Sequence, residues 1–152
     1  MDEHILNYCR DCDEIWHAGD FGNEKIADQL AAVKPLTGVY GNIDGYDITS
    51  MLPETLFWRC EEVTVLMKHI GGYPPKYTTE VKALITAKKP KLFISGHSHI
   101  LKIMYDDKLD CLHMNPGAAG NHGWQKVRTM VRFTIDKNDI KDCEVIELGG
   151  RK

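Results

Sequence analysis

Five polar side chains in the 152-residue chain have the chemical types of a metal site: Asp20, Asn42, His69, His97 and His99. One carboxylate, one amide and three imidazoles, without a thiolate, suit Mn²⁺, Fe, Zn²⁺ or Ni²⁺ better than soft metals. A carboxylate can bridge two such cations about 3.5–4 Å apart, and the pair can clamp a phosphate group and lower the pKa of a water molecule. The residues therefore predict a metal-dependent phosphoesterase with a dinuclear site.

The positions of these residues strengthen the prediction. They lie in four glycine-containing segments, each directly after a predicted strand: Gly19-Asp20, Gly41-Asn42-Ile43-Asp44, His69-Ile70-Gly71-Gly72 and Gly96-His97-Ser98-His99. In α/β sheets, ligands gather at the carboxyl ends of the strands. Taken singly, a Gly-Asp pair or an asparagine is a common turn, and a lone histidine is more often a packed core residue. Four such segments in one short chain favour a shared site.

The elements that must position these segments change character along the chain. In the first half, helices at residues 2–12 and 24–33 alternate with strands at 13–17 and 37–40, which predicts a parallel sheet. The second half contains three predicted hairpins, a buried strand at 91–95 and a helix at 79–87; the hairpins pair 56–60 with 63–68, 101–105 with 109–114, and 128–136 with 140–148. The pattern predicts one mixed α/β (α+β) domain over residues 1–152, with two packed sheets flanked by helices.

Composition excludes several classes of function. A net charge of −3 gives no basic field, so we expect no strong nucleic-acid-binding surface. No apolar run approaches the roughly 18 residues that span a membrane, so we expect no membrane partner. The number of cysteines is odd and their spacing is scattered, which indicates reduced thiols and a cytoplasmic protein. The Cys9-x-x-Cys12 pair is interpreted as one face of a helix, because no second such pair completes a zinc site.

The order of the four polar segments, followed by Asn115-Pro116-Gly117, resembles that of the calcineurin-like metallophosphoesterases. More narrowly, it is similar to the small bacterial phosphodiesterases of the YfcE type. The resemblance extends from about residue 2 to about residue 148. It implies a four-layer sandwich fold, a small phosphodiester as the substrate and a metal-bound hydroxide as the nucleophile. Among the suitable metals, it favours Mn²⁺.

The resemblance also implies roles for the individual residues. Asp20 would bridge the two metals. Asn42, His69 and His97 would complete the shell of the second metal, and Asn42 would also contact the substrate. His99 would bind the first metal. These assignments follow from matching the motifs and are expectations for the structure.

The chain departs from the family pattern at its start, where the family has an apolar strand ending in D-x-H. Asp2-Glu3-His4 spells this motif, but no strand precedes it, so we interpret it as a decoy and expect the true strand upstream of an internal methionine. Without that motif the first metal keeps only Asp20 and His99, so we expect its position to be weak or empty. Loss of a central strand would expose sheet edges. Either the remaining strands close up, or another chain covers the edge, for example in a homo-oligomer.

A second departure concerns the proton donor. Ile43 occupies the place of the histidine that protonates the leaving group in many family members, and isoleucine cannot donate a proton. No catalytic residue is therefore assigned. The alternative to an enzyme is an inactive scaffold, since a retromer subunit with this fold acts by presenting surfaces to partner proteins. Retention of Asp20, Asn42, His69 and His97 favours the enzyme.

Overall fold

The computed structural model of the chain describes residues 1–151. Four helices are present in this range, namely α1 (Glu3–Arg10), α2 (Glu24–Ala31), α3 (Tyr46–Thr49) and α4 (Thr79–Lys88). The strands described are β1 (Ile15–His17), β2 (Leu36–Gly38), β3 (Thr55–Cys60), β4 (Val63–Lys68), β5 (Gly72–Tyr73), β6 (Lys76–Tyr77), β7 (Leu92–Ile94), β8 (Leu101–Asp106), β9 (Cys111–Pro116), β10 (Val127–Asp136) and β11 (Asp139–Gly150).

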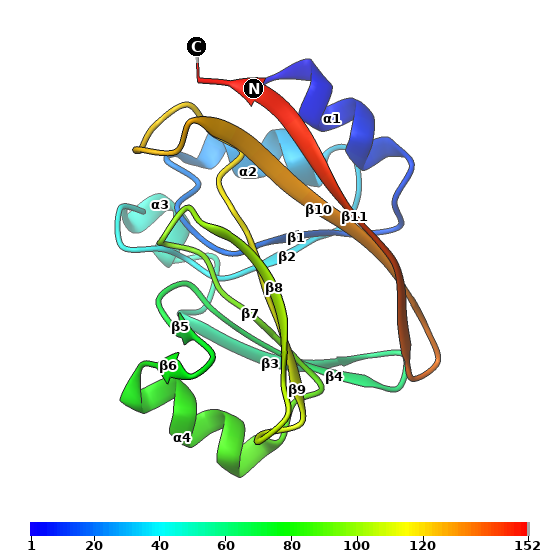
Figure 1. The fold of residues 1–152 in the computed structure, drawn as a ribbon. Helices are drawn as coiled ribbons and strands as arrows, with labels where there is room; N and C mark the ends of the chain where they lie inside the picture. Colours follow the sequence, from blue (N-terminus) through cyan, green and yellow to red (C-terminus); the bar gives the residue numbers. More distant parts are fainter. Residues whose placement is uncertain (152) are drawn as a thin grey trace.

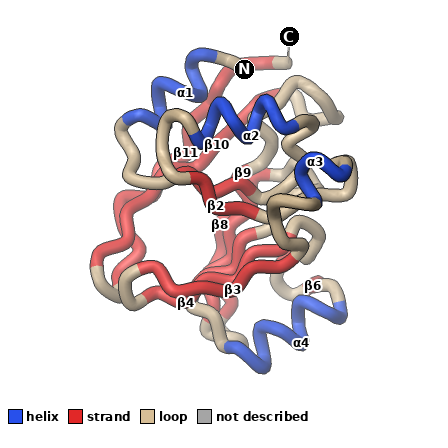
Figure 2. Tube along the Cα trace, turned by 180° about the vertical axis from the view of Figure 1, so that it is seen from behind, coloured by secondary structure: helices blue, strands red, loops and turns tan. Residues whose placement is uncertain are grey.

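These elements form four layers (Figures 1 and 2). Helices α1, α2 and α3 cover one side of a layer made by β1, β2, β10 and β11, and both termini lie at this end of the molecule. The five-stranded sheet is the third layer, and α4 packs on its outer face, where Val81 and Ile85 meet Leu66 and Phe93. The prediction of a mixed α/β fold with packed sheets and outer helices is confirmed.

The five-stranded sheet has the order β3-β4-β7-β9-β8. Strands β4, β7 and β9 are parallel, while β3 and β8 are antiparallel edge strands. Strand β4 is almost entirely buried, as a strand covered on both faces must be. The hairpins predicted for residues 56–68 and 101–114 form the two edges of this sheet. Its parallel centre places the ends of β4 and β7 side by side, directly before two of the candidate metal-binding segments.

The second layer is not a continuous sheet. Strand β1 pairs in parallel with β2, and β10 pairs with β11 in an antiparallel hairpin. Within residues 1–151, β1 has no strand partner besides β2. The expectation that the remaining strands close up is therefore wrong for β1 and β10, which do not pair. The other expectation, that another chain covers this edge, stays a prediction.

Side chains rather than hydrogen bonds join the two sheet layers. Trp16 of β1 meets Trp58 of β3 across the layers, edge-on at 5.0 Å between ring centroids, and within its own layer it meets Phe133 of β10 at 5.6 Å. Around these rings lies the largest buried core, formed by Val39, Val63, Val65, Met67, Leu92, Ile94 and Met114. Aromatic pairs of this geometry add to the free energy gained by burying their area. The core thus holds β1 in place although one of its edges lacks a partner strand.

The first residues begin a helix and do not end a strand. The Asp2 side chain accepts a hydrogen bond from the backbone N–H of His4 and is the N-cap of α1. The same carboxylate lies 2.8 Å from the guanidinium of Arg128 in β10. Arg128 is only 2% exposed. Both contacts are structural, in agreement with the interpretation of Asp2-Glu3-His4 as a decoy.

Most predicted elements are found within a few residues of their predicted limits. Two short elements were not predicted, namely α3 and the β5–β6 hairpin. Both are too short to show a periodic hydrophobic pattern. Helix α2 ends at Ala31 instead of residue 33, although Val33 still packs on its cluster. In the described part of the chain, no helix combines the length and the apolar character needed to cross a lipid bilayer.

Candidate metal centre

The candidate ligands come from the carboxyl ends of strands in both sheet layers. Asp20 follows β1, and Asn42 follows β2, so these two come from the second layer. His69 follows β4 directly, and His97 follows β7 after Ser95-Gly96. One ligand atom from each of Asp20, His69 and His97 lies within 4.8 Å of the others. The structure therefore brings together residues that are up to 77 positions apart in the sequence.

His69 is the best-defined member of the cluster. Its ring is buried, and Nδ1 lies 2.7 Å from the carbonyl oxygen of Ala18. Since a carbonyl oxygen only accepts, Nδ1 carries the proton and donates it. The Nε2 lone pair then faces Oδ1 of Asn42 at 2.9 Å and Oδ2 of Asp20 at 3.1 Å. This is the tautomer that a metal-binding histidine adopts when a carbonyl holds its other nitrogen.

The donor set fits a divalent cation. Asn42 Oδ1 also lies 3.0 Å from Nδ1 of His97, so oxygen and nitrogen atoms of four side chains converge. Carboxylate, amide and imidazole groups are all ligands of divalent first-row cations. Ligands bound at right angles about 2.1 Å from one cation are themselves about 3 Å apart, which matches these separations. The residues that would hold a metal are Asp20, Asn42, His69 and His97.

The backbone at the site is strained. Asp20, His97 and His99 have positive φ angles of 62°, 68° and 61°. Residues other than glycine rarely adopt this left-handed conformation, and each instance costs about 1 kcal/mol or more. Such outliers cluster at functional sites because the surrounding structure enforces them. Gly19, with φ of 102°, provides the space, since a Cβ there would lie 2.6 Å from Nδ1 of His69.

Asp44 holds two of the ligand loops together. One of its carboxylate oxygens accepts hydrogen bonds from the backbone N–H groups of Asp20 and Gly41 at 2.9 and 2.8 Å. The other accepts from the N–H of Gly22 at 3.0 Å. Asp44 is the last residue of the Gly41-Asn42-Ile43-Asp44 segment, and the sequence alone assigned it no role. Its contacts join the loop after β1 to the loop after β2, and thus fix the position of Asp20 relative to Asn42.

His99 lies apart from the group of three whose ligand atoms fall within 4.8 Å. Its Nδ1 is 2.8 Å from Oε1 of Gln125, a residue that is 5% exposed. The amide nitrogen of Gln125 donates to the carbonyls of Gly120 and His122, so its oxygen must accept from His99. His99 is therefore protonated at Nδ1 and leaves Nε2 with a free lone pair. Sequence reasoning did not find Gln125, because 26 residues separate it from His99.

The Asn115-Pro116-Gly117 segment supports the loop that carries His97. The Asn115 amide donates to the carbonyl of Gly96 at 3.0 Å and to the hydroxyl of Ser98 at 3.1 Å. Its oxygen accepts from the N–H of Gly117 at 3.0 Å. Asn115 is buried, and these three hydrogen bonds hold its side chain against the loop. Its role in this structure is to shape the turn between β7 and β8.

Ile43 offers no proton donor beside the cluster. The side chain is 61% exposed, while its backbone N–H donates to Oδ1 of Asp20 at 3.0 Å. His17 is also close to the site, but its ring is stacked on Phe21 and its Nδ1 accepts from the N–H of Gly19. Burial lowers the pKa of His17 to about 4. His17 is therefore neutral near pH 7 and is not a ready proton donor.

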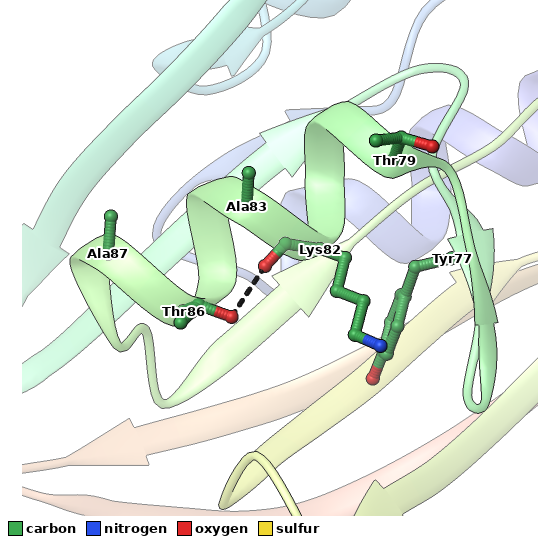
Figure 3. Close-up of a pocket in the computed structure, with 6 residues that line it drawn as sticks. All are labelled: Tyr77, Thr79, Lys82, Ala83, Thr86 and Ala87. Atoms are coloured by element: carbon green, nitrogen blue, oxygen red, sulfur yellow. Dashed lines mark hydrogen bonds between the residues drawn. The ribbon is translucent and has the colours of Figure 1, made fainter.

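A cavity of about 320 Å³ opens beside the cluster. It is lined by Tyr40, Gly41, Asn42, Glu54, Lys68, His69, Ile70, Thr78 and Glu80. A larger open hollow of about 530 Å³ lies along α4 (Figure 3), and its lining is Tyr77, Thr79, Lys82, Ala83, Thr86 and Ala87. None of the candidate ligands borders the larger hollow. The smaller cavity, lined in part by Asn42 and His69, thus places a bound molecule beside the cluster.

Comparisons with known proteins show similarity in sequence and in fold. A "Probable metallophosphoesterase" of Methanothermobacter thermautotrophicus is 29% identical over 148 residues, covering 97% of this chain and 83% of that protein. Among solved structures, wild-type Vps29 of Entamoeba histolytica, crystallised with Zn²⁺, has a TM-score of 0.73 at 17% identity, covering 97% of this chain and 89% of its own. A structure described as that of a novel archaeal phosphodiesterase has a TM-score of 0.73 at 18% identity. The match covers 95% of this chain and 88% of the phosphodiesterase chain.

The two structural similarities show the fold, and a family model adds the sequence relationship. The model of the calcineurin-like phosphoesterase superfamily domain matches residues 1–138. This range contains Asp20, Asn42, His69, His97 and His99, and it leaves out only the last part of the β10–β11 hairpin. The chain is therefore a member of the calcineurin-like phosphoesterase superfamily.

Proposed function

We propose that the chain is a metal-dependent phosphodiesterase that acts on a small phosphodiester. The observation that carries the proposal is the convergence of potential metal-ligand atoms from Asp20, Asn42, His69 and His97 beside a cavity. His97 and Asn42 are exposed, so the cluster is open to a substrate from that side. We further propose two metal positions that share Asp20, with His99 at the first of them and Asn42, His69 and His97 at the second, and Mn²⁺ as the preferred metal.

A divalent cation bound here supplies a Lewis acid for the phosphoryl oxygens and lowers the pKa of a water molecule, which creates a nucleophile near neutral pH. The protein residues prepare the site. The Ala18 carbonyl fixes the tautomer of His69, and Asp44 keeps Asp20 beside Asn42. Because these groups are already in place, little reorganisation is needed during the reaction. Leaving-group protonation has no side-chain donor at Ile43, which favours substrates with stable leaving groups.

The test is hydrolysis of bis(p-nitrophenyl) phosphate by the 152-residue chain with added Mn²⁺. We expect turnover that falls by about 10²-fold or more in Asp20→Asn, since the variant loses the only carboxylate in the cluster. Asp28→Asn, an exposed change on α2, is the matched control and should retain full activity. Turnover that Asp20→Asn leaves unchanged would contradict the proposal.

The inactive scaffold is the second candidate, and the fold similarity to Vps29 is the observation in its favour. The same assay separates the two candidates when metal binding is measured in parallel. Tight binding of Mn²⁺ or Zn²⁺ without any phosphodiester turnover would favour the scaffold. Turnover that depends on Asp20 would favour the enzyme, because a protein that only binds partners does not need to hydrolyse phosphodiesters.

A further inference from the structure

Lys68 is a buried cation in the cavity beside the candidate metal centre. Its side chain is 7% exposed, and Nζ lies 3.0 Å from a carboxylate oxygen of Glu54, 3.3 Å from the Thr55 hydroxyl and 3.5 Å from a carboxylate oxygen of Glu80. An ammonium group has three protons to donate. Glu54 and the Thr55 hydroxyl accept hydrogen bonds from Lys68, and Glu80 lies at ion-pair distance, so the ammonium is already engaged by protein groups.

The remaining polar groups of the cavity are mostly acceptors. Glu54 and Glu80 are 62% and 65% exposed, so each carboxylate keeps lone pairs open to a ligand. The hydrogen bond from Lys68 lowers the pKa of Glu54, which keeps that carboxylate charged at neutral pH. The Tyr40 hydroxyl lies 3.4 Å from Glu54 and donates to it. The charges of Lys68, Glu54 and Glu80 sum to −1. The exposed carboxylates can accept hydrogen bonds from a ligand, so the cavity suits a ligand that donates them.

The beginning of α4 does not reverse this balance. A helix N-terminus can attract anions through its free N–H groups. Here the Thr78 side chain accepts from the N–H of Val81, and Glu80 adds a negative charge to the first turn. The N-terminus is therefore capped and acidic, and it offers little to an anionic ligand.

Asn42 and His69 line the same cavity as Glu54, Lys68 and Glu80. A phosphodiester held at the cluster would therefore extend one of its two ester groups into this space. At about 320 Å³ the cavity lies at the lower end of the range for small-molecule pockets, so the group must be small.

We propose that this cavity is the subsite for one ester group of the substrate, and that it selects a small amino alcohol over an anionic group. The inference rests on the proposed phosphodiesterase function and adds a substrate class to it. The ammonium of the amino alcohol donates to Glu54 and Glu80, whereas a carboxylate in the same place meets two like charges. Selectivity arises as much from this repulsion as from the new contacts.

The experiment compares two ligands that share the methyl phosphodiester and the two-carbon linker but end in opposite charges, methyl 2-aminoethyl phosphate and methyl 2-carboxyethyl phosphate. Each is titrated into the Zn²⁺-loaded chain, and dissociation constants come from NMR shifts of backbone amides. We expect the amino ligand to bind at least about fivefold more tightly than the carboxyl ligand. The interaction of two unit charges about 4 Å apart gives this factor even in a water-like medium. The shifts should include Tyr40 and Val81, which lie at the cavity and at its α4 side.

Glu80→Gln tests the origin of the selectivity, because it removes one exposed charge from the cavity and leaves its shape. We expect the ratio of the two dissociation constants to fall by about fivefold. Glu62→Gln, an equally exposed change in the β3–β4 turn, is the control and should keep the wild-type ratio. Equal affinities, tighter binding of the carboxyl ligand, no binding of either ligand, or a ratio that Glu80→Gln leaves unchanged would each overturn the proposal.

The same preparation is assayed with bis(p-nitrophenyl) phosphate, so that the two proposals can fail separately. Selective binding of the amino ligand without turnover would support the subsite and contradict the hydrolase. Turnover without charge selectivity would support the hydrolase and overturn the subsite.

Discussion

At the scale of single residues, the candidate site depends on supporting side chains as well as on ligands: Asp44 holds Asp20 beside Asn42, and Gln125 holds the ring of His99. Asp20, Asn42, His69 and His97 stand out because each follows a predicted strand and has a side chain that binds metals. Asp44 and Gln125 carry no such signal. Their importance depends on which backbone N–H or ring nitrogen they meet after folding, and no local pattern encodes contacts between residues more than 20 positions apart.

Gln125 should act on metal binding through His99. Gln125→Leu removes the acceptor that holds Nδ1 of His99, so the ring loses its fixed tautomer and orientation. We expect Zn²⁺ binding at His99 to weaken by about 10–100-fold, the usual effect of losing such a partner. Histidine ring signals in an NMR titration measure this. Gln29→Leu on exposed α2 is the control, and equal affinities in both variants would refute the role of Gln125.

His113 should make stability depend on pH. It is buried in β9 against the ring of Phe93, and burial lowers its pKa to about 4 from the ordinary 6.5. The unfolded state therefore takes up the proton first, and stability is lost as the pH falls from about 6.5 towards 4. This group alone should cost about 2 kcal/mol between pH 6.5 and 4.5.

Urea unfolding at these two pH values measures the effect of His113. In His113→Leu, the loss of stability between pH 6.5 and 4.5 should be smaller by about 2 kcal/mol. His4→Gln, a change of an exposed histidine, should behave like the wild type. An identical pH dependence in His113→Leu and the wild type would show that His113 does not contribute.

At the scale of elements, the hydrophobic pattern predicted the long strands and helices well. The β3–β4 and β8–β9 hairpins were predicted because alternating residues flank short polar turns. Helix α1 was predicted from Asp2 and its apolar face, but its attachment to β10 was not. That attachment depends on the buried pair of Asp2 and Arg128, which are 126 positions apart.

Asp2 should matter for stability and not for metal binding. Asp2→Ala leaves the Arg128 charge buried without this partner and removes the N-cap of α1. We expect the free energy of unfolding to fall by about 3–5 kcal/mol, while the Zn²⁺ affinity of the folded protein is unchanged. The control is Asp11→Ala, since Asp11 is 81% exposed and 3.9 Å from Arg132, and should lose less than about 1 kcal/mol.

Urea unfolding and calorimetric Zn²⁺ titration of the Asp2→Ala and Asp11→Ala variants provide the two readouts. A tenfold loss of Zn²⁺ affinity in a stably folded Asp2→Ala protein would contradict the interpretation of Asp2-Glu3-His4 as a decoy.

At the scale of the whole molecule, the four-layer architecture could be predicted and the continuity of the second layer could not. Parallel strands followed by hairpins indicate two sheets, and the buried core between them agrees with this pattern. Whether β1 pairs with β10 depends on how closely these two strands, far apart in the sequence, approach each other. The rings of Trp16 and Phe133 pack together between them. Local sequence patterns carry no information on such a distance.

The architecture also explains why the candidate site is assembled at all. Asp20 and Asn42 come from one sheet layer and His69 and His97 from the other, so the cluster exists only when the two layers pack. Metal binding by these four side chains should therefore add to the stability of the packed state, because the unfolded chain does not hold them together.

The central claim is tested most directly by anomalous diffraction from a crystal of the chain soaked in Mn²⁺. The account predicts a Mn²⁺ ion coordinated by the side chains of Asp20, Asn42, His69 and His97. A second ion, if bound, should lie between Asp20 and His99. Mn²⁺ bound only elsewhere in the molecule, or a cluster that stays free of Mn²⁺ at saturating concentration, would contradict the assignment of these residues as a metal centre.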